Sequence, residues 1–250
     1  MTLQEFFLKN PRAALAFSGG TDSACLLWAA IDAGAQVQPY FIQSEFQPRF
    51  ELEDARRVCR ELGIELKIIS LELLDCPEIA SNPPERCYYC KRRLFTALIE
   101  AASMDGYSLV IDGTNASDRS ADRPGMRAIR ELGVRSPLRE AGIDKAGVRE
   151  MSRRAGLFTA EKPSYACLAT RIPSGVLIRR EDLERVERGE AALAALGYSN
   201  FRLRLKERGA LLQFDAAQLA DAEANLENIR TLLGDGFGEI RIDPVGRKGD

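Results

Sequence analysis

Residues 13–23 read Ala-Ala-Leu-Ala-Phe-Ser-Gly-Gly-Thr-Asp-Ser, and this stretch decides the fold. Its apolar half, which ends at Phe17, predicts a short buried strand. The apolar positions from Ala24 onward predict a helix, whose first turn Asp22 and Ser23 can cap. A strand that passes through a few small residues into a helix is the basic unit of an α/β sheet.

The small residues between this strand and helix form a candidate anion site. Ser18, Gly19 and Gly20 let the backbone turn sharply and approach a ligand closely. The helix that follows directs its free N–H groups and the positive end of its dipole at the same point. No Gly-Lys-Ser/Thr follows the glycines, which excludes the P-loop of kinases. The dinucleotide-binding fingerprint is excluded as well, because it needs a third spaced glycine. An ordinary strand–helix turn is the alternative.

Composition excludes several classes of function. The 250 residues can bury one large core or two modest ones, and the net charge of −2 disfavours general binding to nucleic acid. No signal peptide or apolar span is present, so we expect a cytoplasmic protein without a membrane partner, whose six cysteines are reduced. The chain has no histidine, which excludes His-containing triads and metal sites.

Alternating strand and helix patterns predict a doubly wound, parallel α/β sheet over the first part of the chain. We expect further strands at 37–42, 64–69 and 109–111, helices at 51–62, 88–104 and 144–155, and an irregular loop at 75–86 before Cys87. Pro39 favours an edge position or a bulge in the second strand. Ligands of such sheets bind off the carboxyl ends of the strands, which is where the residue 18–23 loop lies.

The pattern changes near residue 175. Beyond it we expect helices at 180–196 and 216–233, an antiparallel hairpin around Gly209, and a last strand at 238–242. These elements predict two domains: residues 1–175 carry the sheet and the cysteines, and residues 176–250 form a small α+β domain.

Three cysteines are candidate metal ligands. Cys87 and Cys90 form a C-x₂-C pair, and Cys167 lies in a loop that we expect near the same sheet edge. A structural zinc ion would lack a fourth ligand. A disulfide-exchange role for the C-x₂-C pair stays open, although the surrounding sequence is not thioredoxin-like. Three cysteines alone suit a cubane iron–sulfur cluster with one open iron. Cys76 is a weaker candidate, and Cys25 and Cys59 are predicted as buried thiols within helices.

The loop Ser-Gly-Gly-Thr-Asp-Ser, directly after the first strand, resembles the pyrophosphate (PP) loop of the N-type ATP pyrophosphatases. Further blocks are similar to one branch of that superfamily, the LarE family of pyridinium-3,5-biscarboxylic acid mononucleotide sulfurtransferases. They are Asn82 to Lys91 (NPPERCYYCK), Asp112 to Asn115 (DGTN), Arg123 to Gly125 (RPG), Arg135 to Leu138 (RSPL), Lys162-Pro163 (KP) and Ala166 to Arg171 (ACLATR). The similarity covers nearly the whole chain and is looser in the C-terminal domain.

The resemblance implies a reaction that makes the sulfur ligands of the nickel-pincer nucleotide, which is the cofactor of lactate racemase. ATP adenylylates a substrate carboxylate and releases pyrophosphate, and sulfur then displaces AMP to give a thiocarboxylate. One-cysteine members of the family sacrifice the sulfur of the cysteine that corresponds to Cys167. Members that also have the C-x₂-C pair hold a [4Fe–4S] cluster on three cysteines, and its open iron carries the sulfide. Because this chain has Cys87, Cys90 and Cys167, the resemblance predicts the type that carries the cluster. The donor of the sulfide is unknown. The resemblance also implies a closed homo-oligomer.

The same resemblance implies roles for individual residues. Pyrophosphate and Mg²⁺ are expected at Ser18, Gly19, Gly20, Asp22 and Ser23, and adenosine at Ser44 and Asn115. The predicted catalytic residues are Cys167, Asp22 and Ser23. The small mononucleotide substrate is assigned to Arg123, Arg135, Arg171, Glu190, Arg202 and Arg204, for which a solvated surface is the alternative. Lys91-Arg92-Arg93 is predicted as a solvated helix face and not as a tRNA-binding patch.

Two other functions remain open at the level of sequence. One is tRNA thiolation by a related PP-loop enzyme, against which stand the net charge and the lack of an evident RNA-binding module. The other is a metal-binding assembly module without catalysis, against which stands the intact loop.

Overall fold

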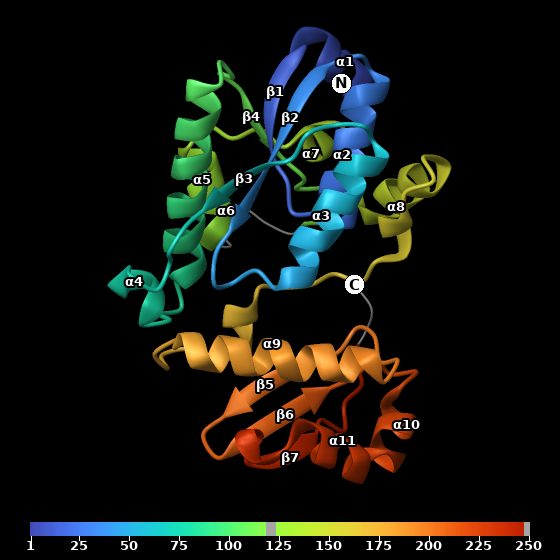
Figure 1. The fold of residues 1–250 in the computed structure, drawn as a ribbon. Helices are drawn as coiled ribbons and strands as arrows, with labels where there is room; N and C mark the ends of the chain where they lie inside the picture. Colours follow the sequence, from blue (N-terminus) through green and yellow to red (C-terminus); the bar gives the residue numbers. More distant parts are fainter. Residues whose placement is uncertain (119–123, 248–250) are drawn as a thin grey trace. The chain divides into compact units, whose positions relative to one another are not determined.

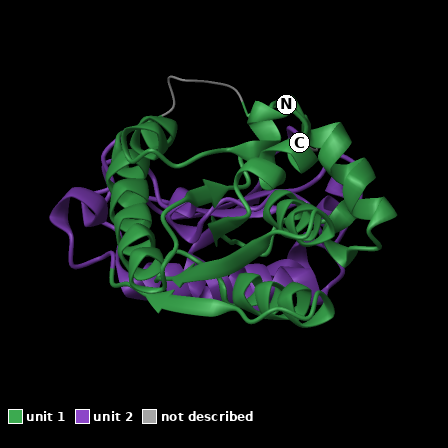
Figure 2. Cartoon of the chain, turned by 90° about the horizontal axis from the view of Figure 1, so that it is seen from above, with its two compact units in different colours: residues 1–72, 85–162 green, residues 73–84, 163–250 purple. Residues whose placement is uncertain are grey.

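The chain, seen in a computed structural model, is described over residues 1–118 and 124–247. It divides into two compact units (Figure 2): unit 1 comprises residues 1–72 and 85–162, and unit 2 comprises residues 73–84 and 163–250. The chain therefore passes between the units after residues 72, 84 and 162. This division differs from a boundary near residue 175, because the loop that carries Cys167 packs with the C-terminal elements.

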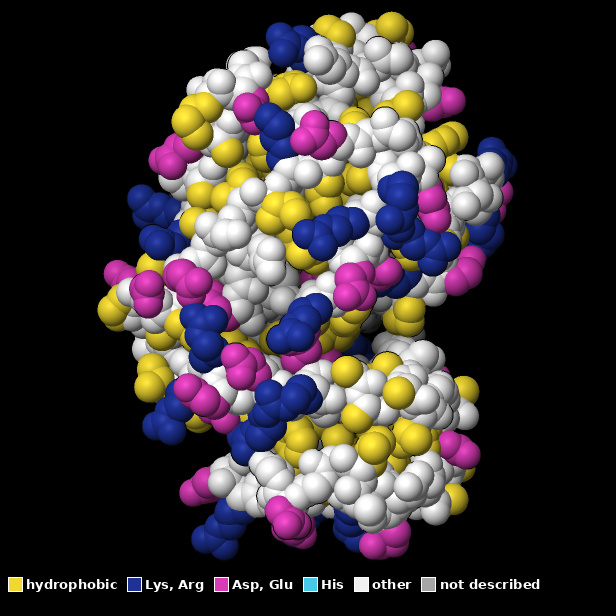
Figure 3. Space-filling model, viewed as in Figure 1, with side chains coloured by type: hydrophobic (Ala, Val, Ile, Leu, Met, Phe, Trp, Pro, Cys, Tyr) yellow, Lys and Arg dark blue, Asp and Glu magenta, His cyan; other side chains and the backbone are white. Residues whose placement is uncertain are grey.

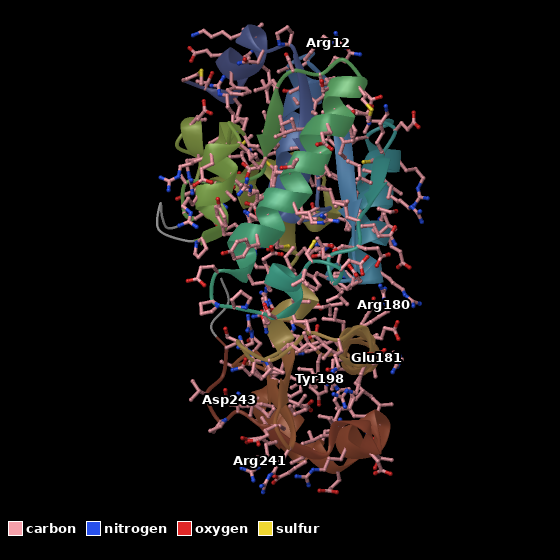
Figure 4. All side chains as sticks on the ribbon, turned by 90° about the vertical axis from the view of Figure 1, so that its left-hand side faces the viewer. Arg12, Arg180, Glu181, Tyr198, Arg241 and Asp243 are labelled. Atoms are coloured by element: carbon pink, nitrogen blue, oxygen red, sulfur yellow. The ribbon has the colours of Figure 1, made fainter. Side chains whose placement is uncertain are left out.

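Unit 1 is built on a four-stranded sheet in which every pair of neighbours is parallel (Figure 1). Its strands are β1 (Arg12–Ala16), β2 (Gln36–Gln43), β3 (Lys67–Ser70) and β4 (Val110–Asp112), in the order β3-β2-β1-β4. The predicted doubly wound α/β fold is thereby confirmed. Because the strands are parallel, their carboxyl ends share one edge; Arg12, labelled in Figure 4, begins β1 at the opposite edge.

Helices cover both faces of this sheet. They are α1 (Leu3–Lys9), α2 (Thr21–Asp32), α3 (Arg49–Glu61), α5 (Arg86–Met104), α6 (Pro124–Glu131), α7 (Pro137–Glu140), α8 (Lys145–Arg154) and the 3₁₀ helix η1 (Phe158–Glu161). Leu26 and Leu27 of α2 belong to an apolar cluster with residues of α1, α3 and α8, and Phe95 and Leu98 of α5 belong to a second cluster with α6. Each fully buried leucine stabilises the fold by about 2 kcal/mol.

The expectation for Pro39 was wrong, since β2 is an interior strand of the sheet. Pro39 pairs with Leu15 of β1, but the pairing of β2 with β3 begins only at Tyr40. At Pro39 the strand therefore has one neighbour, and the missing N–H interrupts no ladder with β3. The side chain of Gln38 supplies a contact there, because its Nε2 donates to Glu65 O at 2.8 Å.

Unit 2 holds a smaller sheet. Its strands are β5 (Arg202–Lys206), β6 (Gly209–Gln213) and β7 (Glu239–Ile242), and its helices are α4 (Pro77–Ala80), η2 (Leu168–Arg171), α9 (Arg180–Ala195), α10 (Leu219–Ala224), α11 (Leu226–Leu233) and η3 (Asp235–Phe237). The predicted β5–β6 hairpin is antiparallel, and β7 adds to β6 in parallel.

Two local predictions for this unit were wrong. The single helix expected at 216–233 is broken at Asn225, which has φ −97° and ψ 12° and whose Nδ2 donates to Tyr198 Oη at 3.3 Å. The segment expected to be an irregular loop before Cys87 contains the short helix α4, which Pro77 begins because its missing N–H needs no partner in a first turn.

Two surface properties bear on function. Within the described ranges, no helix is long and apolar enough to cross a membrane. On the face drawn in Figure 3, basic and acidic side chains are interspersed. This mixture agrees with the net charge of −2, and the face drawn in Figure 3 has no broad basic patch for a nucleic-acid backbone.

Candidate functional site

The loop between β1 and α2 is held by its own serines. Ser18 N donates to Ser23 Oγ at 3.3 Å, the two hydroxyl oxygens lie 3.2 Å apart, and Gly20 N donates to Ser18 Oγ at 3.3 Å. The predicted capping by Asp22 and Ser23 was wrong: α2 begins at Thr21, so both residues lie within its first turn. Within the described residues no side chain caps this helix, which leaves its first N–H groups available to an anion.

Two glycines allow neighbouring backbones to approach the loop. Gly19 has φ +69°, and a Cβ there would lie 2.7 Å from Ala55 N of α3. A Cβ on Gly113, just after β4, would lie 2.9 Å from Ser23 N. The loop is thus packed between α3 and the end of β4, with no room for a side chain at either position.

The carboxylate of Asp22 is held in place by hydrogen bonds from two other side chains. It accepts a hydrogen bond from Lys145 Nζ at 2.6 Å on one oxygen and from Asn115 Nδ2 at 2.9 Å on the other. Lys145 is the first residue of α8. The sequence analysis missed this lysine, because no motif in a single sequence marks a residue 123 positions away.

A second segment reaches the start of α2 from η1. Thr21 Oγ1 donates to Thr159 O at 2.8 Å, and Arg149 Nη1 donates to Ala160 O at 2.7 Å. Lys162, at the end of this segment, pairs with Asp54 of α3 at 2.6 Å, and both side chains are largely buried. Residues 158–162 therefore place a lysine next to the α3 turn that packs on Gly19.

A pocket of about 320 Å³ opens at the carboxyl ends of β1, β2 and β4. This volume lies at the lower end of the range for small-molecule sites. Its described lining residues are Ala16, Phe17, Ser18, Gly20, Asp22, Ser23, Tyr40, Phe41, Ile42, Gln47, Glu51, Lys91, Leu94, Phe95, Asp112, Gly113 and Thr114. The pocket combines apolar strand residues on one side with the loop, three carboxylates and one lysine on the other.

The two residues predicted to hold adenosine lie outside the described pocket lining, and each forms a hydrogen bond with a residue that belongs to it. Ser44 lies outside the described lining, and its Oγ donates to Gln47 Oε1 at 2.5 Å, which directs Gln47 at the pocket. Asn115, 3% exposed, is also outside the lining and holds Asp22. Asp112, a lining residue that was not assigned a role, is 5% exposed and accepts hydrogen bonds from Thr114 Oγ1 and Ser136 Oγ, each at 2.6 Å.

The C-x₂-C pair lies in the first turns of α5. Cys87 is exposed, Cys90 is half-buried, and Arg86 Nη2 lies 3.7 Å from Cys87 Sγ. Residues three apart on a helix share a face, so the two thiols can bind one metal centre. Cys167 is half-buried and precedes η2 in unit 2. Within the described residues no group of three or more Cys, Asp or Glu side chains forms a metal site.

The other cysteines differ in environment. All six lie in the described ranges and are thiols. Burial raises the pKa of Cys25 to about 11, an effect that a hydrogen bond with Ser152 partly offsets, and burial raises the pKa of Cys59 to about 12. Both are buried in the same apolar cluster, within helices as predicted. Their raised pKa values make them poor nucleophiles and poor metal ligands.

The predicted substrate arginines of unit 1 are not gathered at the pocket. Arg123 lies outside the described residues. Arg135 Nε donates to Glu140 Oε1 at 3.0 Å, and its guanidinium lies 4.5 Å from the centre of the Phe6 ring. The side chain of Arg135 is thus directed at α1 and α7, and it is not among the described lining residues.

Two predicted substrate residues of unit 2, Glu190 and Arg171, do lie together. Glu190 is 6% exposed and accepts from Arg171 Nε at 2.6 Å, Tyr165 Oη at 2.5 Å and Leu203 N at 3.0 Å. Arg171 is 1% exposed and also donates to Ala166 O at 3.0 Å. Glu190 thereby ties the Cys167 loop to α9 and β5.

The remaining predicted arginines adjoin this cluster. Arg202 Nη2 donates to Ser164 O at 2.6 Å, and burial, followed by the charges of Arg171 and Arg247, lowers the pKa of Arg202 to about 10. The same causes lower the pKa of Arg204, which is exposed on β5. These guanidinium groups make the vicinity of Tyr165 electropositive and favour an anion there.

Comparison with known proteins agrees with this geometry. The sequence profile of the family described as Queuosine biosynthesis protein QueC matches residues 12–81, which contain the loop and the first three strands. The parallel sheet and the loop thus define an α/β PP-loop protein of the adenine nucleotide α-hydrolase type.

Relatives that match nearly the whole chain indicate which PP-loop family it belongs to. The chain is 35% identical to an uncharacterized protein of Synechocystis sp., across 98% of this chain and 92% of the relative. It is 29% identical to the pyridinium-3,5-bisthiocarboxylic acid mononucleotide synthase of Lactiplantibacillus plantarum, across 94% and 86%. It is 30% identical to an uncharacterized protein of Methanocaldococcus jannaschii, across 96% and 92%. The chain belongs to the LarE family.

Proposed function

We propose that this protein is an ATP-dependent sulfurtransferase that converts a carboxylate of a small mononucleotide into a thiocarboxylate. The proposal is supported by the name of the Lactiplantibacillus plantarum relative, which describes synthesis of a bisthiocarboxylic acid mononucleotide. It is also supported by the loop and by the pocket beside it. We expect the cytoplasm as its location and a homo-oligomer as its assembly.

The first step is adenylylation of the substrate. A carboxylate oxygen attacks the α-phosphorus of ATP, the bond from that phosphorus to the bridging oxygen breaks, and pyrophosphate leaves with the electron pair. The uncapped N–H groups of α2 bind the pyrophosphate oxygens, and Ser18 and Ser23 hold the loop in position. Mg²⁺ would offset the phosphate charge, with Asp22 and Asp112 as the carboxylates available to it.

The second step replaces AMP with sulfur. Cys87 and Cys90 fit a thiolate-ligated cluster, because they share a helix face and are not in a disulfide. They supply two ligands, and we assign the third position to Cys167 of unit 2. A [4Fe–4S] cluster held in this way would supply sulfide as the nucleophile. Glu190 and Arg171 keep the Cys167 loop in one conformation.

The observation that carries the proposal is the position of Asp22, held by Lys145 and Asn115 next to the uncapped start of α2. The test is release of pyrophosphate from ATP with the biscarboxylate mononucleotide. Asp22→Asn should lower the rate of pyrophosphate release by about a hundredfold or more, since it removes a negative charge that is available to Mg²⁺. Asp32→Asn, at the exposed end of the same helix, is the matched control. Normal pyrophosphate release by Asp22→Asn would contradict the assignment.

The sulfur source is tested separately. After anaerobic reconstitution, iron and acid-labile sulfide near four each per chain are expected for the cluster. Single Ala variants of Cys87, Cys90 and Cys167 should each lose the cluster and multiple turnover, whereas Cys76→Ala should keep both. A full cluster in any of the three single variants rules out the three-ligand arrangement. An iron-free protein that still transfers sulfur once would indicate Cys167 as a sacrificial donor.

A further inference from the structure

The helix that carries the cysteine pair also contributes a cation to the pocket. Lys91, adjacent to Cys90, lines the pocket together with Leu94 and Phe95 of α5. Arg92 and Arg93 are exposed, as predicted for a solvated helix face, but Lys91 is half-buried and does not belong to that face. Among the described lining residues, Lys91 is the one basic side chain.

Other cations near the loop are engaged by carboxylates. Lys145 pairs with Asp22 and Lys162 pairs with Asp54, each at 2.6 Å. Lys91 makes no hydrogen bond or ion pair with any described residue. A half-buried ammonium group that lines a pocket without a carboxylate partner is available to an anionic ligand.

The direction of this side chain is set by its surroundings. Gly125, in the first turn of α6, lies so close that a Cβ there would be 3.1 Å from Lys91 Cδ and 3.4 Å from Cε. The apolar stem of Lys91 therefore packs along α6, and the same residue lines the pocket. Such packing reduces the freedom that the side chain would lose on binding a ligand.

We propose that Lys91 binds the α-phosphate of the nucleotide, in both ATP and the departing AMP; this rests on the proposed function. The loop and the start of α2 take the pyrophosphate portion, and the pocket lining runs from that loop to Lys91 on the facing helix. The α-phosphate carries one negative charge in ATP and in the acyl adenylate, and it gains a second when AMP leaves. When sulfur displaces AMP, the phosphate leaves with the electron pair of the broken acyl–oxygen bond, and the ammonium group stabilises that charge.

The test compares AMP with adenosine, which differ by the α-phosphate. Equilibrium binding of each is measured by competition with a fluorescent ATP analogue on the full chain. Lys91→Met should weaken AMP binding by about tenfold to a hundredfold and leave adenosine unchanged, because a charge-assisted hydrogen bond is lost. Lys91→Arg should restore part of the AMP affinity. Arg92→Met, the exposed neighbour, should change neither affinity.

Exchange of labelled pyrophosphate into ATP gives a second readout. In the presence of the carboxylate substrate, Lys91→Met should lower kcat more than it raises the KM for ATP, while its iron content after reconstitution stays that of the unsubstituted protein. An unchanged ratio of AMP to adenosine affinity in Lys91→Met overturns the role of Lys91 and leaves the proposed function standing. An unsubstituted protein that binds AMP and adenosine but exchanges no pyrophosphate overturns the proposed function, and the affinity ratio then still decides whether Lys91 contacts the phosphate.

Discussion

Lys145 donates a hydrogen bond to Asp22 at 2.6 Å, although 123 residues separate the two in sequence. Both side chains are largely buried, with 21% of Lys145 and 26% of Asp22 exposed. The pair joins the first residue of α8 to the first turn of α2, where an anion is expected to bind. An ammonium group at this position offsets the charge of Asp22, which would otherwise repel the phosphates.

Removal of this ammonium group should weaken the binding of ATP. Lys145→Met leaves the Asp22 carboxylate without its cation, so we expect about a tenfold loss of affinity for ATP or pyrophosphate. Arg154→Met serves as the control, because Arg154 lies on the same helix with 75% of its side chain exposed. Isothermal titration with both ligands measures the effect. Equal affinities for the two variants would show that Lys145 does not act on the anion site.

Loss of the buried carboxylate of unit 2 should be strongly destabilising. Glu190→Leu leaves Arg171, which is 1% exposed, without its ionic partner, and we expect a fall of about 3–5 kcal/mol in the free energy of unfolding. Urea denaturation followed by far-UV circular dichroism measures this loss.

The same helix provides the control for Glu190. Glu184 pairs with Arg188 at 3.9 Å, with 53% and 73% of the two side chains exposed. Glu184→Leu should cost less than about 1 kcal/mol, because exposed pairs contribute little. Similar losses in the two variants would mean that the Glu190 cluster does not anchor the Cys167 loop.

A comparison of Gly19 with Gly63 distinguishes the cost of a positive φ from the cost of a steric clash. Gly19 and Gly63 have φ values of +69° and +68°, but only at Gly19 would a Cβ meet other described atoms, the closest being Ala55 N at 2.7 Å. Gly63→Ala should cost about 1–2 kcal/mol of stability from its backbone conformation alone. Gly19→Ala should cost clearly more and should also weaken ATP binding, since α3 must move away from the loop. Thermal melts and ATP titrations of both variants provide the comparison.

Alkaline pH should destabilise the fold through Cys25. Its pKa rises from 9.0 to about 11 on folding, so above pH 9 the unfolded chain has released a proton that the folded chain retains. Stability is therefore full below pH 9 and falls between pH 9 and about 11. From pH 8 to pH 10 this group should lower the free energy of unfolding by about 1 kcal/mol.

The contribution of Cys25 is isolated by difference. Cys25→Ala should be less stable at pH 8 but should lose about 1 kcal/mol less than the unsubstituted protein on going to pH 10. Urea titrations under reducing conditions at the two pH values measure this, with the exposed Cys87→Ala as control. If Cys25→Ala showed the same pH dependence as the control, burial of Cys25 would not govern alkaline stability.

Local pattern was sufficient to predict the parallel sheet and the loop. The run that ends at Phe17 and the small residues after it predict β1, the turn and α2 because each feature depends on neighbours in sequence. The same holds for the antiparallel β5–β6 hairpin.

Partners that depend on tertiary packing could not be predicted in this way. Lys145 and Gly113 meet the start of α2 only after the sheet has formed, and nothing in their local sequence marks the contact. Arg135 has the expected residue type for an anion site, but packing selects Glu140 and Phe6 as its neighbours. The placement of residues 73–84 with unit 2 depends on contacts with residues far along the chain.

That placement has a consequence for the order in which the chain matures. Asn82 Nδ2 donates to Pro173 O, and Gly175 N donates to Asn82 O, each at 2.8 Å, while Ile178 N donates to Ala80 O at 2.8 Å. During synthesis, residues 73–84 leave the ribosome long before these partners exist. Unit 2 therefore cannot complete its folding until residue 178 has been synthesised. By then the whole of α5, with Cys87 and Cys90, has already been synthesised. Until residue 167 is added, the growing chain contains Cys87 and Cys90 but not Cys167.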